Sequence, residues 1–511
     1  MLLTHPLYMT EICDENPEFL SKVRASMDIL SSQIVTDRIS ELPDEILVDC
    51  LSLLDMKSTA QTSIISRRWR YLWTHLSTLD FDPELTYPEE FETFSKNEKY
   101  ETTKYFAWIN QVVSVHRGTS IDKFRVHSRY VTSYATQLDK WVQFAFSKRV
   151  KELVLNLIGI NLICIDHSEK GYPLGFETLR YPPCYTGITA IQSLHLCYVN
   201  VSDEFLEFLM SHCHHLERLY LQAIPLSNLK VKSSKLKYLS IVMCFSDLEE
   251  LEIDAENLLY FLYDDAKREG GPHMVFRCVP KLVETDFRGG LCQFPFPIFE
   301  KLSLFSGQLC KLSLDIDPNW KTYETDLAIP EGVIPSFPNL KQFTCTTICY
   351  DSSCILALKR FIEACPNLEE LKMQIIYMQN DGYCEADVLR EIDLDENLQP
   401  EINFSSGHDM EIGHVPDTVT GNMNEEKSSH QNLRILEVVG FLGVECDTRL
   451  ILAIINYACS LKTVICDPQG IRYSHTPFDN FTDAPNEHDA AKRRARQLAK
   501  IVEPKVKVVV I

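Results

Sequence analysis

Hydrophobic and polar positions follow one recurring pattern along most of the chain, L-x-x-L-x-L, in which an apolar entry residue precedes alternating apolar residues. Such alternation is typical of a short strand with one buried face. We expect eleven such strands. They start at Val150, Ile191, Leu216, Leu236, Leu248, Phe299, Leu309, Leu340, Leu368, Leu433 and Leu461. Repetition on this scale predicts stacked strand units rather than one compact core.

Helical periodicity occupies some of the gaps between these strands. In residues 201–212, Phe205, Leu206 and Leu209 share one helical face. Residues 104–127 and 138–157 each predict a helix followed by a strand; the second helix has an apolar face made by Leu138, Trp141, Val142 and Ala145. Other gaps are too short for a helix, so we expect an irregular array with strands on one side and helices or loops on the other.

The stretch from residue 37 to residue 82 has a different pattern, typical of three short helices. Pro43 suits a first helical turn, with Asp44 and Glu45 at the positive end of the helix dipole. The polar segment 55–58 offers caps for a second helix. A third is expected around Trp69. The apolar residues of the first helix, at i, i+1, i+4, i+5 and i+8, are Ile46, Leu47, Cys50, Leu51 and Leu54.

A unit of this size is only marginally stable on its own unless a metal, a disulfide or a partner stabilises it. Its sequence offers no metal site and no disulfide. A partner protein that buries the surplus apolar surface is therefore expected. The segments "LPDEIL", "TSIISRRWRYLW" and "LDFD" resemble the F-box in its plant form, although "LDMKSTAQTS" lacks the proline that often precedes Lys57.

The F-box resemblance implies docking on a Skp-type adaptor, and through it on a cullin–RING ubiquitin ligase of the SCF class. By motif position, the first four of the following residues would face the adaptor, and the other four would pack the module and extend the contact. The eight residues are Leu42, Pro43, Ile46, Leu47, Leu54, Trp69, Leu72 and Trp73.

The strand repeats resemble degenerate leucine-rich repeats, which stack strands in a parallel sheet and bind partners on one face. The end of the chain resembles the FBD module that often closes plant F-box/leucine-rich-repeat proteins. The expected fold is an α/β solenoid of irregular repeats preceded by a three-helix F-box. Its segments are 1–36, a poorly ordered N-terminus; 37–82, the F-box; 100–378, the solenoid; 379–430, a flexible acidic insertion; and 431–511, FBD-like repeats with a basic tail.

Charge and composition narrow the functional classes. The net charge of −22 argues against binding to nucleic acid or to an anionic membrane. The first 36 residues lack the features of a signal peptide, and no apolar run is long enough to span a bilayer. The 18 cysteines are then expected to be reduced and mostly buried. We expect residence in the cytoplasm, the nucleus or both.

Two segments concentrate charge. Residues 379–430 carry 13 acidic residues against two basic ones, a net charge of −11, which indicates a solvated loop or a site for a basic partner. The basic cluster of Lys492, Arg493, Arg494 and Arg496 falls in an expected helix that ends before Pro504. It is interpreted as a solvent face, with nuclear import or binding to an acidic surface as alternatives. The final "KVKVVVI" predicts a strand that caps the array.

The sequence contains few candidates for metal-binding or catalytic residues. His212, Cys213, His214 and His215 are adjacent at a helix end and point in different directions, so they do not predict a zinc site. No cysteine lies in an activating motif, and no phosphate-binding loop or hydrolase motif occurs. We therefore expect no cofactor, no metal and no catalytic residue in this chain.

The sequence thus predicts a non-catalytic, substrate-recognition subunit of an SCF-type ubiquitin ligase, in which the repeats hold an unidentified target protein. The F-box would place the target's lysines near the conjugating enzyme, so that tethering raises their effective concentration. Two alternatives stay open: a scaffold that delivers nothing for degradation, and a receptor whose partner binding depends on a small ligand.

Overall fold

The computed structural model divides the chain into two compact units. The first spans residues 1–236 and 244–246, and the second spans 237–243 and 247–511. Within them, the structure describes residues 39, 41–82, 98–128, 134–158, 171–180, 186–242, 248–265, 271–292, 297–316, 334–348, 360–376, 429–443, 445–469 and 485–511. The expected N-terminal segment 1–36 and nearly all of the acidic segment 379–430 lie outside these residues. In the described part, no helix is long and apolar enough to cross a membrane.

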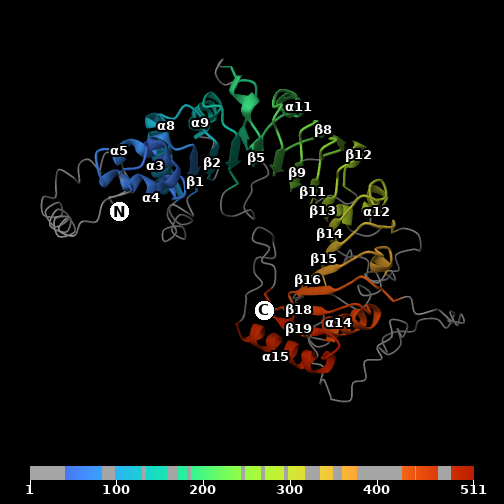
Figure 1. The fold of residues 1–511 in the computed structure, drawn as a ribbon. Coiled ribbons are helices and arrows are strands. Elements are labelled where there is room, and N and C mark those ends of the chain that lie inside the picture. Colours follow the sequence, from blue (N-terminus) through green and yellow to red (C-terminus); the bar gives the residue numbers. More distant parts are fainter. Residues whose placement is uncertain are drawn as a thin grey trace, which may run out of the picture. The chain divides into compact units, whose positions relative to one another are not determined.

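The first unit opens with the helical module expected at residues 37–82 (Figure 1). Pro43 is the N-cap of its first helix, with Asp44 and Glu45 in the first turn. Asp55 caps the second helix by accepting a hydrogen bond of 2.8 Å from the backbone N–H of Ser58. The elements are α3 (Asp44–Leu51), α4 (Met56–Gln61), the 3-10 turn η1 (Thr62–Ile64), α5 (Trp69–Leu72) and the 3-10 turn η2 (Trp73–His75).

A parallel sheet follows the helical module in the first unit. Its strands, in spatial order, are β1 (Thr78–Phe81), β2 (Lys123–His127), β3 (Glu152–Asn156), β5 (Ser193–Cys197) and β7 (Arg218–Gln222). The connections contain α8 (Glu98–Val115), α9 (Ala135–Ser147), η5 (Ile188–Ala190) and α11 (Asp203–His212). Two short strands, β4 (Tyr172–Pro173) and β6 (Val199–Asn200), pair with each other, and β8 (Asn228–Lys232) packs beside α11.

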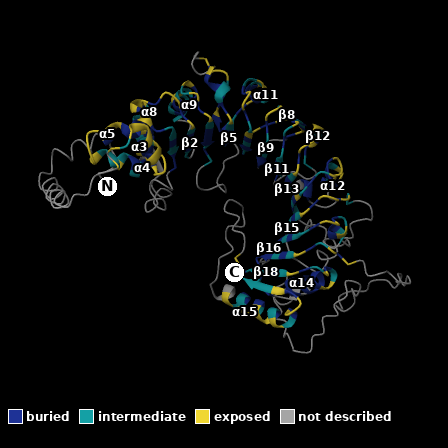
Figure 2. Ribbon diagram, in the orientation of Figure 1, coloured by how far each residue is buried: buried dark blue, intermediate teal, exposed yellow. Residues whose placement is uncertain are grey.

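The alternation in sequence sets the two faces of this sheet. The strand register aligns one buried residue from each of five strands: Leu79, Phe124, Leu153, Leu194 and Leu219. Figure 2 shows buried residues in dark blue along the strands of the sheet. These five residues face the helices, because successive side chains in a strand point to opposite faces. The residues between them form the other face, which the helices leave open.

Helices α8 and α9 are held against the buried face of the sheet by aromatic and polar contacts. The hydroxyl of Tyr105 in α8 donates to the backbone carbonyls of Phe81, at 2.6 Å, and His127, at 3.0 Å. The indole N–H of Trp141 in α9 donates to the side-chain oxygen of Asn110 at 2.8 Å. The apolar face expected for α9 is confirmed, since Leu138, Trp141, Val142 and Ala145 are buried.

The second unit continues the same architecture. Its parallel strands, in spatial order, are β9 (Tyr238–Val242), β11 (Tyr260–Asp265), β13 (Glu284–Gly289), β14 (Lys311–Ile316), β15 (Gln342–Ile348), β16 (Glu370–Ile376), β17 (Ile435–Val439), β18 (Thr463–Asp467) and β19 (Lys507–Val510). Outside this sheet, β10 (Glu250–Asp254) pairs in parallel with β12 (His273–Cys278). The other elements are η6 (Gly290–Cys292), α12 (Ile298–Leu302), α14 (Glu445–Tyr457) and α15 (Pro485–Val502).

Ten of the eleven expected strands are present, and the one expected at Phe299 is wrong. Residues 298–302 form α12, in which Ile298, Phe299 and Leu302 are buried at helical spacing. A strand would place Leu302 and Leu304 on one face, yet Leu304 is 64% exposed. The strand expected at Leu248 exists as β10, but it pairs with β12 rather than joining the long sheet.

The C-terminal expectations are confirmed: α15 ends before Pro504, and β19 pairs in parallel with β18. A buried turn joins α15 to the repeats. The Asp447 carboxylate accepts from the backbone N–H groups of Leu442, at 3.0 Å, and Gly443, at 2.8 Å. Arg494 of α15 donates to the Leu442 carbonyl at 2.9 Å, so this member of the basic cluster is a structural residue.

Candidate functional site

The helical module has a small core of its own. Leu47 and Leu51 of α3 are buried, and so are Trp69, Leu72 and Trp73 from the segment of α5 and η2. Residues of α3 contact both α5 and η2. The burial of large aromatic and aliphatic side chains supplies most of the stabilisation available to a module of this size.

A second set of large apolar side chains in the same module faces solvent. Leu53 is 86% exposed, and the others are between 44% and 59% exposed. This set is Ile39, Ile46, Leu53, Leu54, Ile64, Ile65 and Tyr71. Single exposed apolar residues are ordinary on protein surfaces, but seven within 33 residues are a high local concentration. We call these seven residues the apolar surface of the module.

An ion pair fixes the loop that leads into this surface. The Arg68 guanidinium donates to the Asp44 carboxylate from Nε at 2.7 Å, and it also donates to the backbone carbonyl of Leu42. One side chain after α4 thereby holds both the "LPDEIL" loop and the start of α3. Arginine suits this role because its planar, fork-shaped donors can engage two acceptors at once.

The eight residues implied by the motif divide between the core and the surface. Leu47, Trp69, Leu72 and Trp73 are buried, Leu42 is half-buried, and Pro43, Ile46 and Leu54 are exposed. The buried four lie where they pack the module, so the exposed members are the ones available for direct contact.

Five members of the apolar surface were not among those eight: Ile39, Leu53, Ile64, Ile65 and Tyr71. Ile64, Ile65 and Tyr71 lie inside the "TSIISRRWRYLW" segment, so the motif signal was present. Helical spacing could not separate them from the core, because α4 passes into a 3-10 turn and the helical period is lost there.

The open face of the first unit's sheet carries a polar network. Asp82 is almost fully buried and pairs with Arg125 at 2.8 Å and with His127 at 3.5 Å. Asp80 pairs with Lys123 and with Arg125, each at 3.6 Å. These pairs link β1 to β2 on the face away from the helices.

Further along this face, two hydrogen-bonding groups have no partner among the residues that the structure describes. The Oδ1 atom of Asn156 and the Nε2 atom of His195 are buried and make no hydrogen bond. Burial, with the positive charges of Arg125 and His127 nearby, lowers the pKa of His195 to about 4. The imidazole is therefore neutral near pH 7 and can both donate and accept. Its ring lies 4.0 Å from that of Tyr220. Unsatisfied buried polar groups cost free energy, so their presence on the open face sets this part of the sheet apart.

The open face of the second unit's sheet carries an aspartate, Asp264, whose pKa is raised. Burial raises the pKa of Asp264 to about 6; Arg288 opposes this shift, and Asp286 and Asp265 add to it. Arg288 is itself engaged by Asp286, with donor–acceptor distances of 3.1 and 2.7 Å. The negative charge of Asp264 is consequently the one in this cluster that is least balanced by a neighbouring positive charge.

The cysteines with shifted pKa values are poorly suited to nucleophilic chemistry. Burial raises the pKa of Cys197 and of Cys213 to about 12, which keeps both thiols protonated. The Cys213 thiol donates to the carbonyl of Ile188 at 3.2 Å and lies in the core, while His214 and His215 beside it are exposed. In the described residues, no group of three or more potential ligands is placed to hold a metal ion.

Comparison with protein families matches two parts of the chain. The F-box domain model matches residues 39–80, which contain the helical module. A leucine-rich-repeat domain model, described as the At1g61320/AtMIF1 type, matches residues 112–393, more than half of the chain.

Curated relatives of this chain come from Arabidopsis thaliana. The F-box/FBD/LRR-repeat protein At1g13570 is 26% identical over 356 residues, covering 66% of this chain and 76% of the relative. The putative F-box/FBD/LRR-repeat protein At4g00315 is 27% identical, with coverages of 66% and 78%. The F-box/LRR-repeat protein At3g59200 is 24% identical, with coverages of 68% and 71%.

Proposed function

The chain belongs to the plant F-box/leucine-rich-repeat proteins, and on this basis we propose that it is the target-recognition subunit of an SCF-type ubiquitin ligase. The F-box docks on a Skp-type adaptor, which joins it to a cullin. The repeats bind a target protein. The chain itself performs no chemistry; the ubiquitin transfer belongs to the other subunits.

The observation that carries the adaptor-docking step is the apolar surface of the F-box. The module already has a complete core in Leu47, Leu51, Trp69, Leu72 and Trp73, so the seven exposed residues are surplus to its own packing. Burying a large aliphatic side chain contributes about 1.5–3 kcal/mol. A partner that covers several of them therefore gains enough to form a stable complex.

We place adaptor contact on the exposed residues, with Pro43, Ile46 and Leu54 taken from the motif and Leu53 and Ile64 added by the structure. The four buried residues of the motif act by packing the module. The Arg68 pair with Asp44 holds the loop that bears Leu42 and Pro43 in the shape that the adaptor meets.

Target binding is placed on the open face of the repeat sheets. On a parallel repeat sheet, the residues between the buried strand positions are presented together as one surface. In the first unit this surface includes His195 and Asn156, whose buried polar atoms have no hydrogen-bond partner in the described part of the chain. A target that supplies hydrogen bonds to these atoms would recover the cost of their burial. The adaptor and target would meet in the cytoplasm, the nucleus or both.

Calorimetric titration of a purified Skp-type adaptor into the full chain tests adaptor docking. The variant Ile46→Glu/Leu54→Glu places two charges on the apolar surface, and we expect it to weaken binding about 100-fold or more. The matched control is Val283→Glu/Leu304→Glu, which charges two exposed apolar residues of the second unit. Equal affinity of the wild type and the F-box variant would overturn the proposal.

A further inference from the structure

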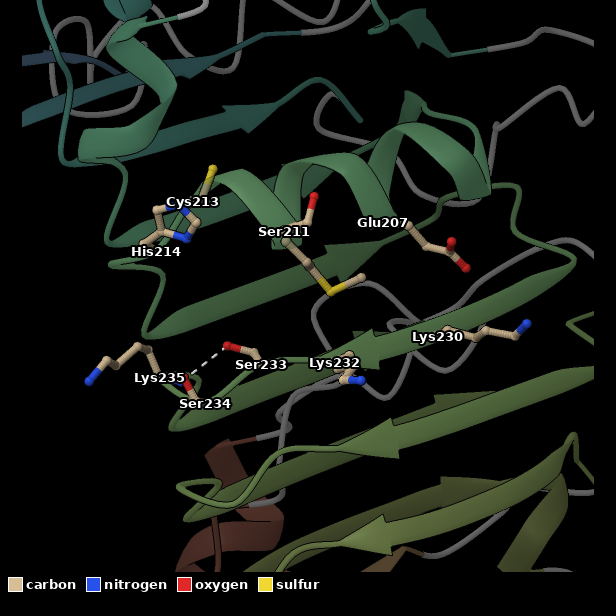
Figure 3. A pocket seen from close by; sticks show the side chains of 10 residues that line it. Glu207, Ser211, Cys213, His214, Lys230, Lys232, Ser233, Ser234 and Lys235 are labelled. Atoms are coloured by element: carbon tan, nitrogen blue, oxygen red, sulfur yellow. Dashed lines mark hydrogen bonds between the residues drawn. The ribbon is translucent and has the colours of Figure 1, made fainter.

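A groove on the first unit separates α11 from β8, on the far side of the repeat from the open sheet face. It has a volume of about 570 Å³. Figure 3 shows its lining side chains arising from the second half of α11, from β8 and from the turn that follows β8. The buried residues Met210 and Cys213 contribute an apolar floor, and the remaining lining residues are polar.

The polar rim of this groove is strongly basic. Lys230, Lys232 and Lys235 line it together with His214, against the single carboxylate of Glu207. Figure 3 shows Glu207 and Lys230 towards one end of the groove and His214 and Lys235 towards the other. Positive charge is therefore in excess, and most clearly at the His214 end. This is notable in a chain whose net charge is −22.

The three ammonium groups are available to a partner. Each lysine is exposed, and in the described residues none of them makes an ion pair. By contrast, two lysines of the same unit are paired: Lys151 with Asp122 at 2.7 Å, and Lys123 with Glu152 at 3.5 Å. Three ammonium groups beside a single carboxylate repel one another, and an anionic partner relieves that repulsion.

The spacing of the lysines indicates the shape of the partner. Residues along β8 alternate between exposed and buried, so Lys230 and Lys232 project from the same side of the strand. Side chains two residues apart on a strand are about 6.6–6.8 Å apart. Carboxylates at alternate positions of an extended peptide have the same spacing, which allows one carboxylate each for Lys230 and Lys232.

We propose that the groove between α11 and β8 binds an extended, acidic peptide segment of a protein partner. Alternate Asp or Glu side chains pair with Lys230 and Lys232, a further acidic side chain pairs with Lys235, and a small residue between them rests on Met210 and Cys213. On the rim, the Ser233 hydroxyl oxygen accepts from the backbone N–H groups of Lys235 and Leu236, which leaves its proton to donate to a carbonyl of the peptide backbone. This site is separate from the F-box and does not depend on adaptor docking.

Fluorescence anisotropy with the full chain tests the proposal. The probe is a fluorescein-labelled peptide of five Glu-Thr repeats, in which threonine favours the extended form. The matched probe contains five Gln-Thr repeats. We expect binding of the glutamate peptide only, weakening several-fold between 50 and 300 mM NaCl because surface ion pairs are screened.

The variant Lys230→Glu/Lys232→Glu/Lys235→Glu should lose at least about 10-fold in affinity for the glutamate peptide, since each lost pair contributes up to about 1 kcal/mol. The control Lys140→Glu/Lys462→Glu/Lys500→Glu makes the same change in net charge at exposed lysines elsewhere, and should bind like the wild type. The F-box variant Ile46→Glu/Leu54→Glu should also retain peptide binding, which separates this site from the proposed adaptor contact. Equal losses in both triple variants, or equal binding of the glutamine peptide, would overturn the proposal.

Discussion

Ile46 and Leu47 are neighbours in α3, yet one is 44% exposed and the other is fully buried. The sequence identified both as apolar residues of one helix, and the motif assigned both to the adaptor. Periodicity alone could not divide them, because a helix of eight residues offers only two turns in which to define a face. The packing of α5 and η2 against α3 decides which residue enters the core.

The difference between buried and exposed residues predicts a large loss of stability on truncating one leucine of the F-box and a small loss on truncating another. Leu47→Ala should lower the free energy of unfolding of the module by about 2–5 kcal/mol, because it leaves a cavity in the core. Leu53→Ala should change that free energy by less than about 0.5 kcal/mol, because the side chain is exposed. Urea denaturation of the two variants of the full chain, followed by tryptophan fluorescence, measures the difference. Similar losses in both variants would contradict the assignment of the core.

Asp264 predicts a pH dependence of stability. Its pKa is raised in the folded chain to about 6, from 3.8. The folded state therefore binds more protons than the unfolded state between these values, and this group's contribution to stability is lost as pH rises through 6. Asp264→Asn removes the buried charge. It should be more stable than the wild type by roughly 1–3 kcal/mol at pH 8, and the gain should shrink towards pH 4.

Urea denaturation at pH 8, 6 and 4.5 measures this dependence. The exposed residue Glu256 provides a control, since Glu256→Gln removes the same charge from the surface. A stabilisation by Asp264→Asn that stays constant across the three pH values would show that the effect does not arise from the titration of Asp264.

At the scale of elements, the alternating pattern predicted strands well because each repeat buries one side of its strand. It was wrong at Phe299, where Pro297 is the N-cap and the buried residues follow helical spacing. It also missed β11 and β13. In "YFLYDD" and "ETDFRG", the buried positions that hold leucine or isoleucine in neighbouring strands are Phe261, Tyr263, Thr285 and Phe287. Parallel pairing with neighbouring strands overrides the weak local pattern there.

The start of α4 depends on a single polar residue. Asp55 accepts hydrogen bonds from the backbone N–H of Ser58 at 2.8 Å and from its hydroxyl at 2.5 Å. Partial burial acts to raise the pKa of Asp55, but these hydrogen bonds lower it overall. The cap is thus strongest while the carboxylate is ionised, and it weakens as pH falls through the lowered pKa.

Asp55→Ala should accordingly cost the F-box about 0.5–2 kcal/mol of stability at pH 7. The control is Asp49→Ala, in which an exposed aspartate within α3 is removed. Thermal unfolding of the two variants followed by circular dichroism should show a lower melting temperature for the Asp55 variant. Equal melting temperatures would mean that α4 forms without its cap.

At the scale of the molecule, the order of modules was predictable from the sequence because its signals are repeated or dense. The F-box motif and the repeat pattern occupy separate parts of the chain, and family models match both. The groove between α11 and β8 was not predictable. Its basic rim joins His214, at the end of a helix, to Lys230, Lys232 and Lys235 on a later strand and turn, and only the packing of α11 on β8 brings them together.

The central claim, that the F-box of this chain docks on a Skp-type adaptor, is tested most directly by co-elution in size-exclusion chromatography. The adaptor would be mixed with the full chain and, separately, with a chain from which residues 37–82 are deleted. We expect a stable one-to-one complex with the full chain and free adaptor with the deletion. A complex of equal amount in both mixtures, or in neither, would contradict the account.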